Sequence, residues 1–200
     1  MTTTYWLIGI TALVSYGAFT SQQILAEAIF SPYRVKQNKE YWRLITAGFL
    51  HADWSHLLLN MFVLFAFGKQ VENEYIQYFG PQGNLVYALM YVSAILVAHI
   101  STLYKEQNNP NYLSLGASGA TSAVVFASIL FHPLQKFYFG IPGFAMGAIY
   151  LYYSSYAAKQ MSDRINHEAH FYGAVYGFVF PIIFKPVIGM YCLMQIKNWF

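Results

Sequence analysis

Hydrophobic and polar positions alternate along the chain in long blocks. Apolar runs are separated by short segments that carry Pro, Gly, Asn and charged residues, which are the residues that end helices. A helix needs roughly 20 mostly apolar residues to cross the hydrocarbon core of a bilayer. The pattern therefore predicts six membrane-spanning helices, near residues 5–25, 55–75, 84–104, 116–132, 141–158 and 168–185.

The connection between the first two predicted spans has a different character. Its sequence, "FSPYRVKQNKEYWRLITAGFLHADW", is too long for a tight turn and too rich in Leu, Phe and Trp for a solvated linker. Such a segment favours a position partly within the membrane interface. No internal repeat is visible, so we expect residues 1–200 to form one domain, an all-α polytopic bundle with a long, partly interfacial first loop.

Composition supports a membrane protein. Hydrophobic residues make up 57% of the chain and charged residues 10%, against roughly 25% charged in a soluble domain. The net charge of +3 comes from scattered cations. The chain therefore has no cluster of basic residues of the kind that binds nucleic acid. The single cysteine excludes an internal disulfide. No Lys or Arg precedes the first apolar run, so we expect it to be a retained span rather than a signal peptide.

The distribution of cations between the loops predicts an orientation. If the six spans alternate, four cations lie on the side of the termini: Lys69, Lys136, Lys185 and Lys197. Seven lie on the opposite side: Arg34, Lys36, Lys39, Arg43, Lys105, Lys159 and Arg164. The positive-inside rule alone would place the long first loop in the cytoplasm.

The second predicted span opens with "HADWSHLLLNMF". Its residues His56 and Asn60 are four apart and share one helix face, with His51 about a turn earlier. Two stacked side-chain donors in apolar surroundings can hold a developing anion. An interhelical hydrogen bond between packed spans is the alternative interpretation.

The fourth and sixth predicted spans carry matching small surfaces. His170, Gly173 and Gly177 fall on one stripe of the sixth span, which directs the histidine toward a neighbouring helix. The segment "GASGATSA" of the fourth span has three positions with almost no side-chain bulk: Gly116, Gly119 and Ala123.

Close contact between these two surfaces would bring the hydroxyl of Ser118 to the ring of His170. A serine whose proton is taken by histidine is a nucleophile, and free N–H groups at the helix start, from about Ala117 to Gly119, would add to the donors for an oxyanion. Tight helix packing alone is the alternative explanation for a serine between glycines.

These segments together resemble the rhomboid family of intramembrane serine proteases. The stretches "YWRLITAGFLHADWSHLLLN", "GASG" and "AHFYGAVYG" match that family's first loop and second helix, its nucleophile motif and its AHxxGxxxG motif, in the same order. The resemblance implies that Ser118 is the nucleophile and His170 the general base. It also implies that the oxyanion is held by His56, Asn60 and the Ser118 N–H, with Gly116 needed for backbone approach.

Further positions are interpreted through the same resemblance. Trp42 and Arg43 match a structural pair in the family's first loop, and Glu72 matches a structural acid near the end of the second helix. Two positions depart from the family: Ser122 replaces a usual aromatic residue that packs on the catalytic histidine, and Phe126 replaces a small residue. Aromatic support is then expected from other side chains: Phe171, Tyr172 or Tyr176.

The resemblance also implies partners and location. Substrates would be transmembrane proteins cleaved in or beside a membrane segment, without cofactor or metal. The protein would be a multi-pass protein of the cell (inner) membrane with both termini in the cytoplasm, against the cation count. The oligomeric state is not predicted.

Three alternatives remain. A metal site could use His167 and His170, although "HEAH" lacks the HExxH spacing. A rhomboid-like pseudoprotease would bind membrane helices without cleaving them. A small transporter would place its polar groups along a pathway, but the acidic residues fall at the ends of the spans. His99, within the third span, is interpreted as a packed polar contact.

Overall fold

The computed structural model describes residues 2–137, 140–160 and 165–200, and each of the six predicted spans corresponds to a helix. These helices are α1 (Thr3–Thr20), α5 (Trp54–Phe79), α6 (Gly83–Glu106), α7 (Ser118–Phe131), α8 (Gly143–Gln160) and α9 (His167–Phe184). A further helix, α10 (Pro186–Trp199), was not predicted. Within the described ranges the regular structure is helical, apart from isolated β-bridges. The loop that contains Arg164 lies partly outside these ranges.

Length and apolarity mark fewer of these helices as membrane spans than the sequence pattern does. In the described part of the chain, one helical stretch, Trp54–Glu106, is long and apolar enough to cross a bilayer, and it contains both α5 and α6. The pair α9 and α10 meets the requirement together, but it is bent by 116° at its break. Helix α7 is apolar but shorter.

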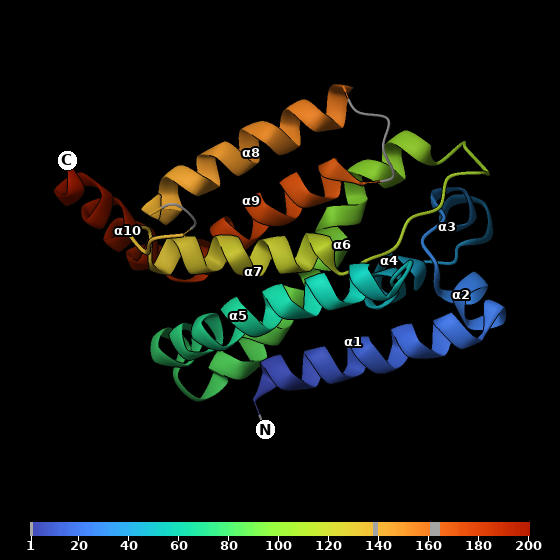
Figure 1. The fold of residues 1–200 in the computed structure, drawn as a ribbon, viewed down its shortest axis with the longest axis horizontal. Helices are drawn as coiled ribbons and strands as arrows, with labels where there is room; N and C mark the ends of the chain where they lie inside the picture. The colour runs from blue at the N-terminus through green and yellow to red at the C-terminus, as the bar shows by residue number, and fades with distance from the viewer. Residues whose placement is uncertain (1, 138–139, 161–164) are drawn as a thin grey trace.

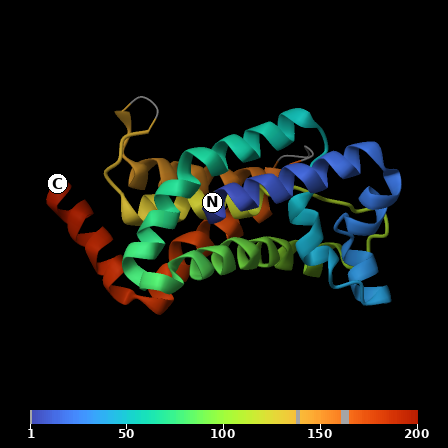
Figure 2. The same cartoon turned by 90° about the horizontal axis from the view of Figure 1, so that it is seen from below.

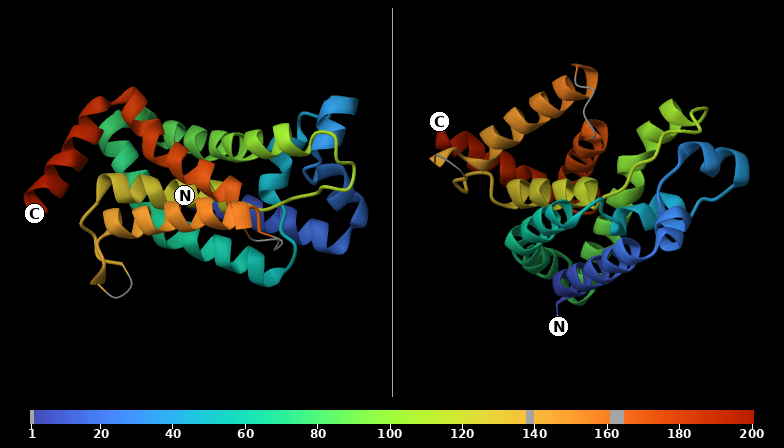
Figure 3. Two further views of the ribbon diagram at one scale, coloured as in Figure 1. Left: turned by 90° about the horizontal axis from the view of Figure 1, so that it is seen from above. Right: turned by 45° about the vertical axis from the view of Figure 1, so that its right-hand side comes forward.

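The helices form a bundle with α7 in its interior (Figure 1). Helix α7 packs against α5, α6, α8 and α9, and nearly all of its residues are buried. Helices α1 and α8 lie on opposite sides of the bundle (Figure 3). The starts of α5, α7 and α9 point toward the same end, which brings three helix N-termini near one another.

The long first loop is folded rather than extended, and it gathers at that same end (Figure 2). It contains α2 (Gln22–Ala28), α3 (Pro32–Asn38), α4 (Arg43–Thr46) and the short 3₁₀ helix η1 (Ala47–Phe49). The side chain of Ser31 accepts a hydrogen bond from the Arg34 N–H and so caps α3. Short capped helices satisfy backbone groups that would be costly to expose near lipid.

A buried arginine holds this loop together. The side chain of Arg43 is 1% exposed, pairs with Glu40, and donates from Nη1 to the carbonyls of Ala26 (2.9 Å) and Ile29 (2.8 Å). Burial would raise the pKa of Glu40, but hydrogen bonds from Asn38 and Arg43 and the charges of both arginines outweigh it and lower this pKa. The sequence-based structural interpretation of Arg43 is consistent with this geometry.

The other two predicted structural residues, Trp42 and Glu72, bond to different parts of the chain. Trp42 is 54% exposed, and its Nε1 donates to the carbonyl of Glu27. Glu72 is buried in α5 and accepts hydrogen bonds from the N–H groups of Thr3 (2.8 Å) and Thr4 (3.2 Å) and from the Thr4 hydroxyl. A carboxylate at the N-terminus of α1 satisfies orphan donors and complements the helix dipole.

We expect the substitution Arg43→Lys to lower the free energy of unfolding by about 1–3 kcal/mol, because lysine cannot reach Glu40 and both carbonyls with one planar fork. Arg34→Lys is the matched control, since Arg34 pairs with the same carboxylate but its side chain is 42% exposed. Reversible unfolding in detergent measures both. Equal effects of the two substitutions would contradict the structural role of Arg43.

Candidate active site

The predicted nucleophile lies at the first residue of α7. Gly116, two residues earlier, has a φ of +130°, a conformation that residues with a Cβ rarely adopt. A Cβ at this position would lie 2.7 Å from Cε1 of His56 and 3.8 Å from the Ser118 hydroxyl. The loop into α7 therefore passes directly over the His56 ring, which leaves room for glycine alone. The ring and the Ser118 hydroxyl both lie close to the position that a Cβ of Gly116 would occupy.

Helices α7 and α9 touch through their backbones. Gly173 of α9 faces the carbonyl of Gly119, and Gly177 faces the backbone of Ala123, so that a Cβ at either position of α9 would overlap α7. At Gly119 a Cβ would lie 3.3 Å from the Ala169 carbonyl. The chain neighbours of Ser118 and His170 are therefore in contact across the two helices.

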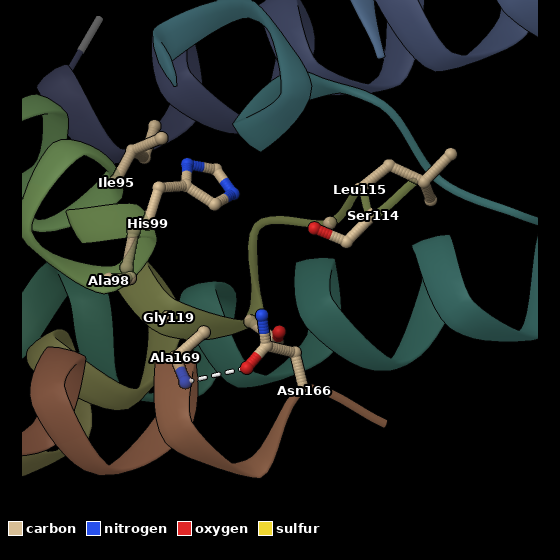
Figure 4. Close-up of a pocket in the computed structure, with 11 residues that line it drawn as sticks. Ile95, Ala98, His99, Ser114, Leu115, Gly119, Asn166 and Ala169 are labelled. Carbon is tan, nitrogen blue, oxygen red and sulfur yellow. Dashed lines mark hydrogen bonds between the residues drawn. The ribbon is translucent and has the colours of Figure 1, made fainter. Parts of the chain in front are cut away.

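A cavity of about 20 Å³ lies at this contact (Figure 4). Its walls come from α6, from the segment before α7, and from the starts of α7 and α9: Ile95, Ala98, His99, Ser114, Leu115, Gly116, Ser118, Gly119, Ala120, Asn166 and Ala169. A space of this size accommodates about one water molecule. The predicted nucleophile thus borders a small, partly polar cavity.

Asn60 occupies a more structural position than the resemblance alone implies. Its side-chain N–H donates to the His56 carbonyl (2.9 Å), and its oxygen accepts from the Thr121 hydroxyl of α7 (3.0 Å). An amide carries two N–H donors, so one remains for a reacting group. The interhelical hydrogen bond, which was the alternative interpretation of Asn60, is therefore present. The role of Asn60 as an oxyanion donor stays a prediction.

One predicted oxyanion donor is engaged elsewhere. Free N–H groups were expected from about Ala117 to Gly119, but the Ala117 N–H donates to Nε2 of His51 at 3.5 Å. Ser118 and Gly119 are the first residues of α7, and their N–H groups have no carbonyl of the same helix four residues earlier. The expectation for Ala117 was therefore wrong, because a side chain of the first loop reaches this N–H group.

The departure at Ser122 has a structural explanation. Its hydroxyl lies 2.7 Å from the hydroxyl of Tyr150 on α8, and the Tyr150 ring packs against Phe126 with centroids 5.5 Å apart. An aromatic side chain from α8 thus fills space beside α7. Ser122 and Phe126, the two departures from the family pattern, therefore both contact Tyr150.

The aromatic residues expected to support His170 have contacts of their own, and their support of the histidine stays a prediction. Tyr176 donates its hydroxyl to Ser93 (2.7 Å) and Phe171 packs against Tyr172. The ring of His170 lies edge-on to that of His167, with centroids 6.1 Å apart. His167 in turn contacts Tyr153 of α8, with centroids 5.9 Å apart. A neighbouring histidine therefore stands beside His170, with an α8 tyrosine behind it.

Two further residues shape the start of α9 and the cavity. Asn166 caps α9 by accepting the Ala169 N–H (3.0 Å), and it donates to the hydroxyl of Thr102 (2.9 Å). Sequence reasoning missed Asn166, although an asparagine just before an apolar helix is a capping signal. His99 contacts the Leu44 carbonyl at 3.0 Å, as the packed polar contact predicted for it.

Comparison with known proteins identifies the family. The family model of the rhomboid domain matches residues 38–187. The chain is 30% identical over 127 residues to Rhomboid-like protein 11, chloroplastic, of Arabidopsis thaliana, covering 63% of this chain and 41% of that protein. It is 29% identical over 146 residues to Putative rhomboid protease YdcA of Bacillus subtilis, covering 73% and 68%.

A third relative, RHOMBOID-like protein 12, mitochondrial, of Arabidopsis thaliana, is 25% identical over 179 residues, covering 80% of this chain and 51% of that protein. The chain thus spans 41% and 51% of the length of these two plant relatives, and 68% of the bacterial one. The rhomboid domain belongs to a class of integral membrane proteins, and the all-helical bundle agrees with that class. The chain belongs to the rhomboid family.

We expect Gly173→Ala to destabilise the protein by about 1–3 kcal/mol, because the added methyl group would overlap the backbone of Gly119 and force α9 away from α7. The matched control is Gly9→Ala in α1, where a Cβ would meet nothing within 4 Å and where alanine improves helix propensity. Thermal unfolding in detergent distinguishes the two. A neutral effect of Gly173→Ala would contradict the close helix contact.

Proposed function

We propose that the protein is an intramembrane serine protease with Ser118 as nucleophile and His170 as general base. The contact of Gly119 with Ala169 and Gly173 carries this proposal, because it joins the starts of α7 and α9 next to the two reacting residues. The Ser118 oxygen attacks the scissile carbonyl as His170 takes its proton. The histidine then returns this proton to the leaving amine, and water hydrolyses the ester by the same route.

Stabilisation of the oxyanion is assigned to the groups around Gly116. The His56 ring and the second N–H of Asn60 supply side-chain donors, and the first N–H groups of α7 supply backbone donors. The support for this assignment is the approach of the Gly116 backbone to His56, which leaves room for glycine alone. The cavity beside Ser118 offers a place for the hydrolytic water.

The substrate would be a transmembrane segment of another protein, which must unwind because a helix hides its carbonyls in its own hydrogen bonds. The proposal of six spans in the bilayer is supported by large apolar side chains that are exposed on the outer helices. Examples are Leu13, Leu58, Phe62, Leu85, Ile149 and Tyr152. Faces of this kind suit lipid. A pseudoprotease that only binds helices is the second candidate, favoured by the departures at Ser122 and Phe126.

We expect a fluorophosphonate probe to label the purified protein at Ser118, and Ser118→Ala to abolish labelling. His170→Ala should do the same, and the double variant should lose little more, because the pair acts as a unit. Ser114→Ala is the matched control, since this serine borders the same cavity. Equal labelling of wild type and Ser118→Ala, or no labelling of wild type while a control hydrolase reacts, would reject the protease and favour the pseudoprotease.

The proposed topology has both termini in the cytoplasm and the first loop outside, against the cation count. We expect a cysteine at Asn108, after α6, to react with a membrane-impermeant maleimide added to intact cells. A cysteine at Gln77, near the end of α5, should react only after lysis. Both positions are exposed, and the native Cys192 is buried and would be replaced by serine. The reverse labelling pattern would overturn this orientation.

A further inference from the structure

A chain of hydrogen bonds connects α1 to the residue before the proposed nucleophile. The Ser15 hydroxyl lies 2.8 Å from the carbonyl of Phe49 and 2.9 Å from Nδ1 of His51. The other ring nitrogen of His51 accepts the Ala117 N–H at 3.5 Å. Ser15, His51 and Ala117 are all buried, with exposures of 0%, 1% and 0%. We call these groups the Ser15–His51–Ala117 relay.

The geometry allows one arrangement of protons in this relay. The Phe49 carbonyl accepts only, so the single hydrogen of the Ser15 hydroxyl is donated to it. The Ser15 oxygen must then accept from His51, which places the ring proton on Nδ1. Nε2 is left with a lone pair, which is what the Ala117 N–H requires. Every group has a partner with a neutral ring in a single tautomer.

We propose that His51 is a positioning residue for the reaction at Ser118, and that Ser15 acts through it by fixing its tautomer. This inference rests on the proposed protease function. The His51 ring does not reach the reacting atoms in this scheme. Its effect is to hold the Ala117 N–H and therefore to set where the backbone turns into α7.

A second hydrogen bond, next to the relay, also holds the backbone before α7. The Gly116 N–H donates to the Ala47 carbonyl at 3.0 Å, so two consecutive N–H groups before Ser118 are bonded to the first loop. The ring of His51 also lies edge-on to that of His56, with centroids 4.8 Å apart. The same side chain thus supports the backbone of the nucleophile and the ring of the proposed oxyanion donor. A shift of about 1 Å at such a site can cost on the order of 100-fold in rate.

Electrostatics favour the neutral ring that the relay needs. Burial, with a smaller contribution from the neighbouring His56, lowers the pKa of His51 to about 3, although the nearby Asp53 raises it. A folded-state pKa below the ordinary value means that protonation of this ring opposes folding, and only at acid pH. A protonated ring would also point an N–H at the Ala117 N–H. Titration of His51 therefore does not contribute to the pH profile near neutrality.

Two substitutions of His51 separate the two halves of the relay. In His51→Gln the amide oxygen reaches the place of Nε2 and can accept the Ala117 N–H. In His51→Asn the shorter amide reaches only the place of Nδ1 and leaves this N–H without its acceptor. We expect kcat to fall less than about 5-fold in the glutamine variant and roughly 10- to 100-fold in the asparagine variant, with KM little changed in both.

Ser15→Ala tests the other end of the relay. It removes the acceptor of the Nδ1 proton, so the ring can adopt the other tautomer, in which its Nε2 proton opposes the Ala117 N–H. We expect an intermediate loss of kcat. His132→Asn, at the opposite end of α7, is the control and should leave kcat unchanged. Equal kcat values for His51→Gln and His51→Asn, or losses confined to thermal stability, would overturn the positioning role.

A measurement that does not need activity keeps the inference separate from the protease proposal. We expect ¹⁵N NMR of the labelled His51 ring to show a protonated Nδ1 and an unprotonated Nε2 in the wild type, and a mixture in Ser15→Ala. A protonated Nε2 in the wild type would reject the relay. Absence of Ser118-dependent labelling together with the expected tautomer would reject the protease and the catalytic effect of His51, while the hydrogen-bond chain would stand.

Discussion

The backbone contact between α7 and α9 is the constraint on which the rest of the structure depends. Helices within lipid gain nothing from moving apolar surface out of water, so they associate through close packing and hydrogen bonds. At Gly173 and Gly177 the packing is so close that no side chain fits between the helices. The residues beside this contact, Ser118 and His170, inherit their relative position from it. The chemistry proposed for these two residues therefore depends on the glycines next to them, which have no side chains to keep the helices apart.

Polar side chains fix the ends of the helices around this contact, and each bonds to backbone. Glu72 accepts an N–H group at the start of α1, and Asn166 caps α9. Within the first loop, Arg43 of α4 donates to a carbonyl of α2, and His51 accepts the N–H of the residue before α7. Unsatisfied backbone groups are costly at membrane depth, and these side chains supply partners for some of the groups that helix ends leave without an intrahelical bond. The folded first loop supplies two of them, which is why it is a structural part of the site.

The positions of the six predicted helices could be inferred from the sequence because each is an apolar run bounded by residues that end helices. The pairing of α7 with α9 could be predicted because small residues at helical spacing mark close contact. Helix α10 was missed, although Pro186 at its first position is a common helix start. The roles of Ser15, Tyr150 and the Ala117 N–H could not be predicted, since each depends on a contact between segments far apart in sequence. Periodicity carries no information about such contacts.

The contact of Ser122 with Tyr150 shows how a departure from a family pattern can be absorbed by a neighbouring helix. The small Ser122 side chain on α7 leaves space that the Tyr150 ring fills from α8. The two hydroxyl groups form a hydrogen bond of 2.7 Å. Tyr153 of the same helix contacts His167 beside His170. Displacement of α8 would therefore break a partly buried hydrogen bond and remove the ring that packs against His167. In this chain the environment of the proposed dyad depends on α8 as well as on α7 and α9. A movement of α8 would therefore change the packing around the proposed dyad.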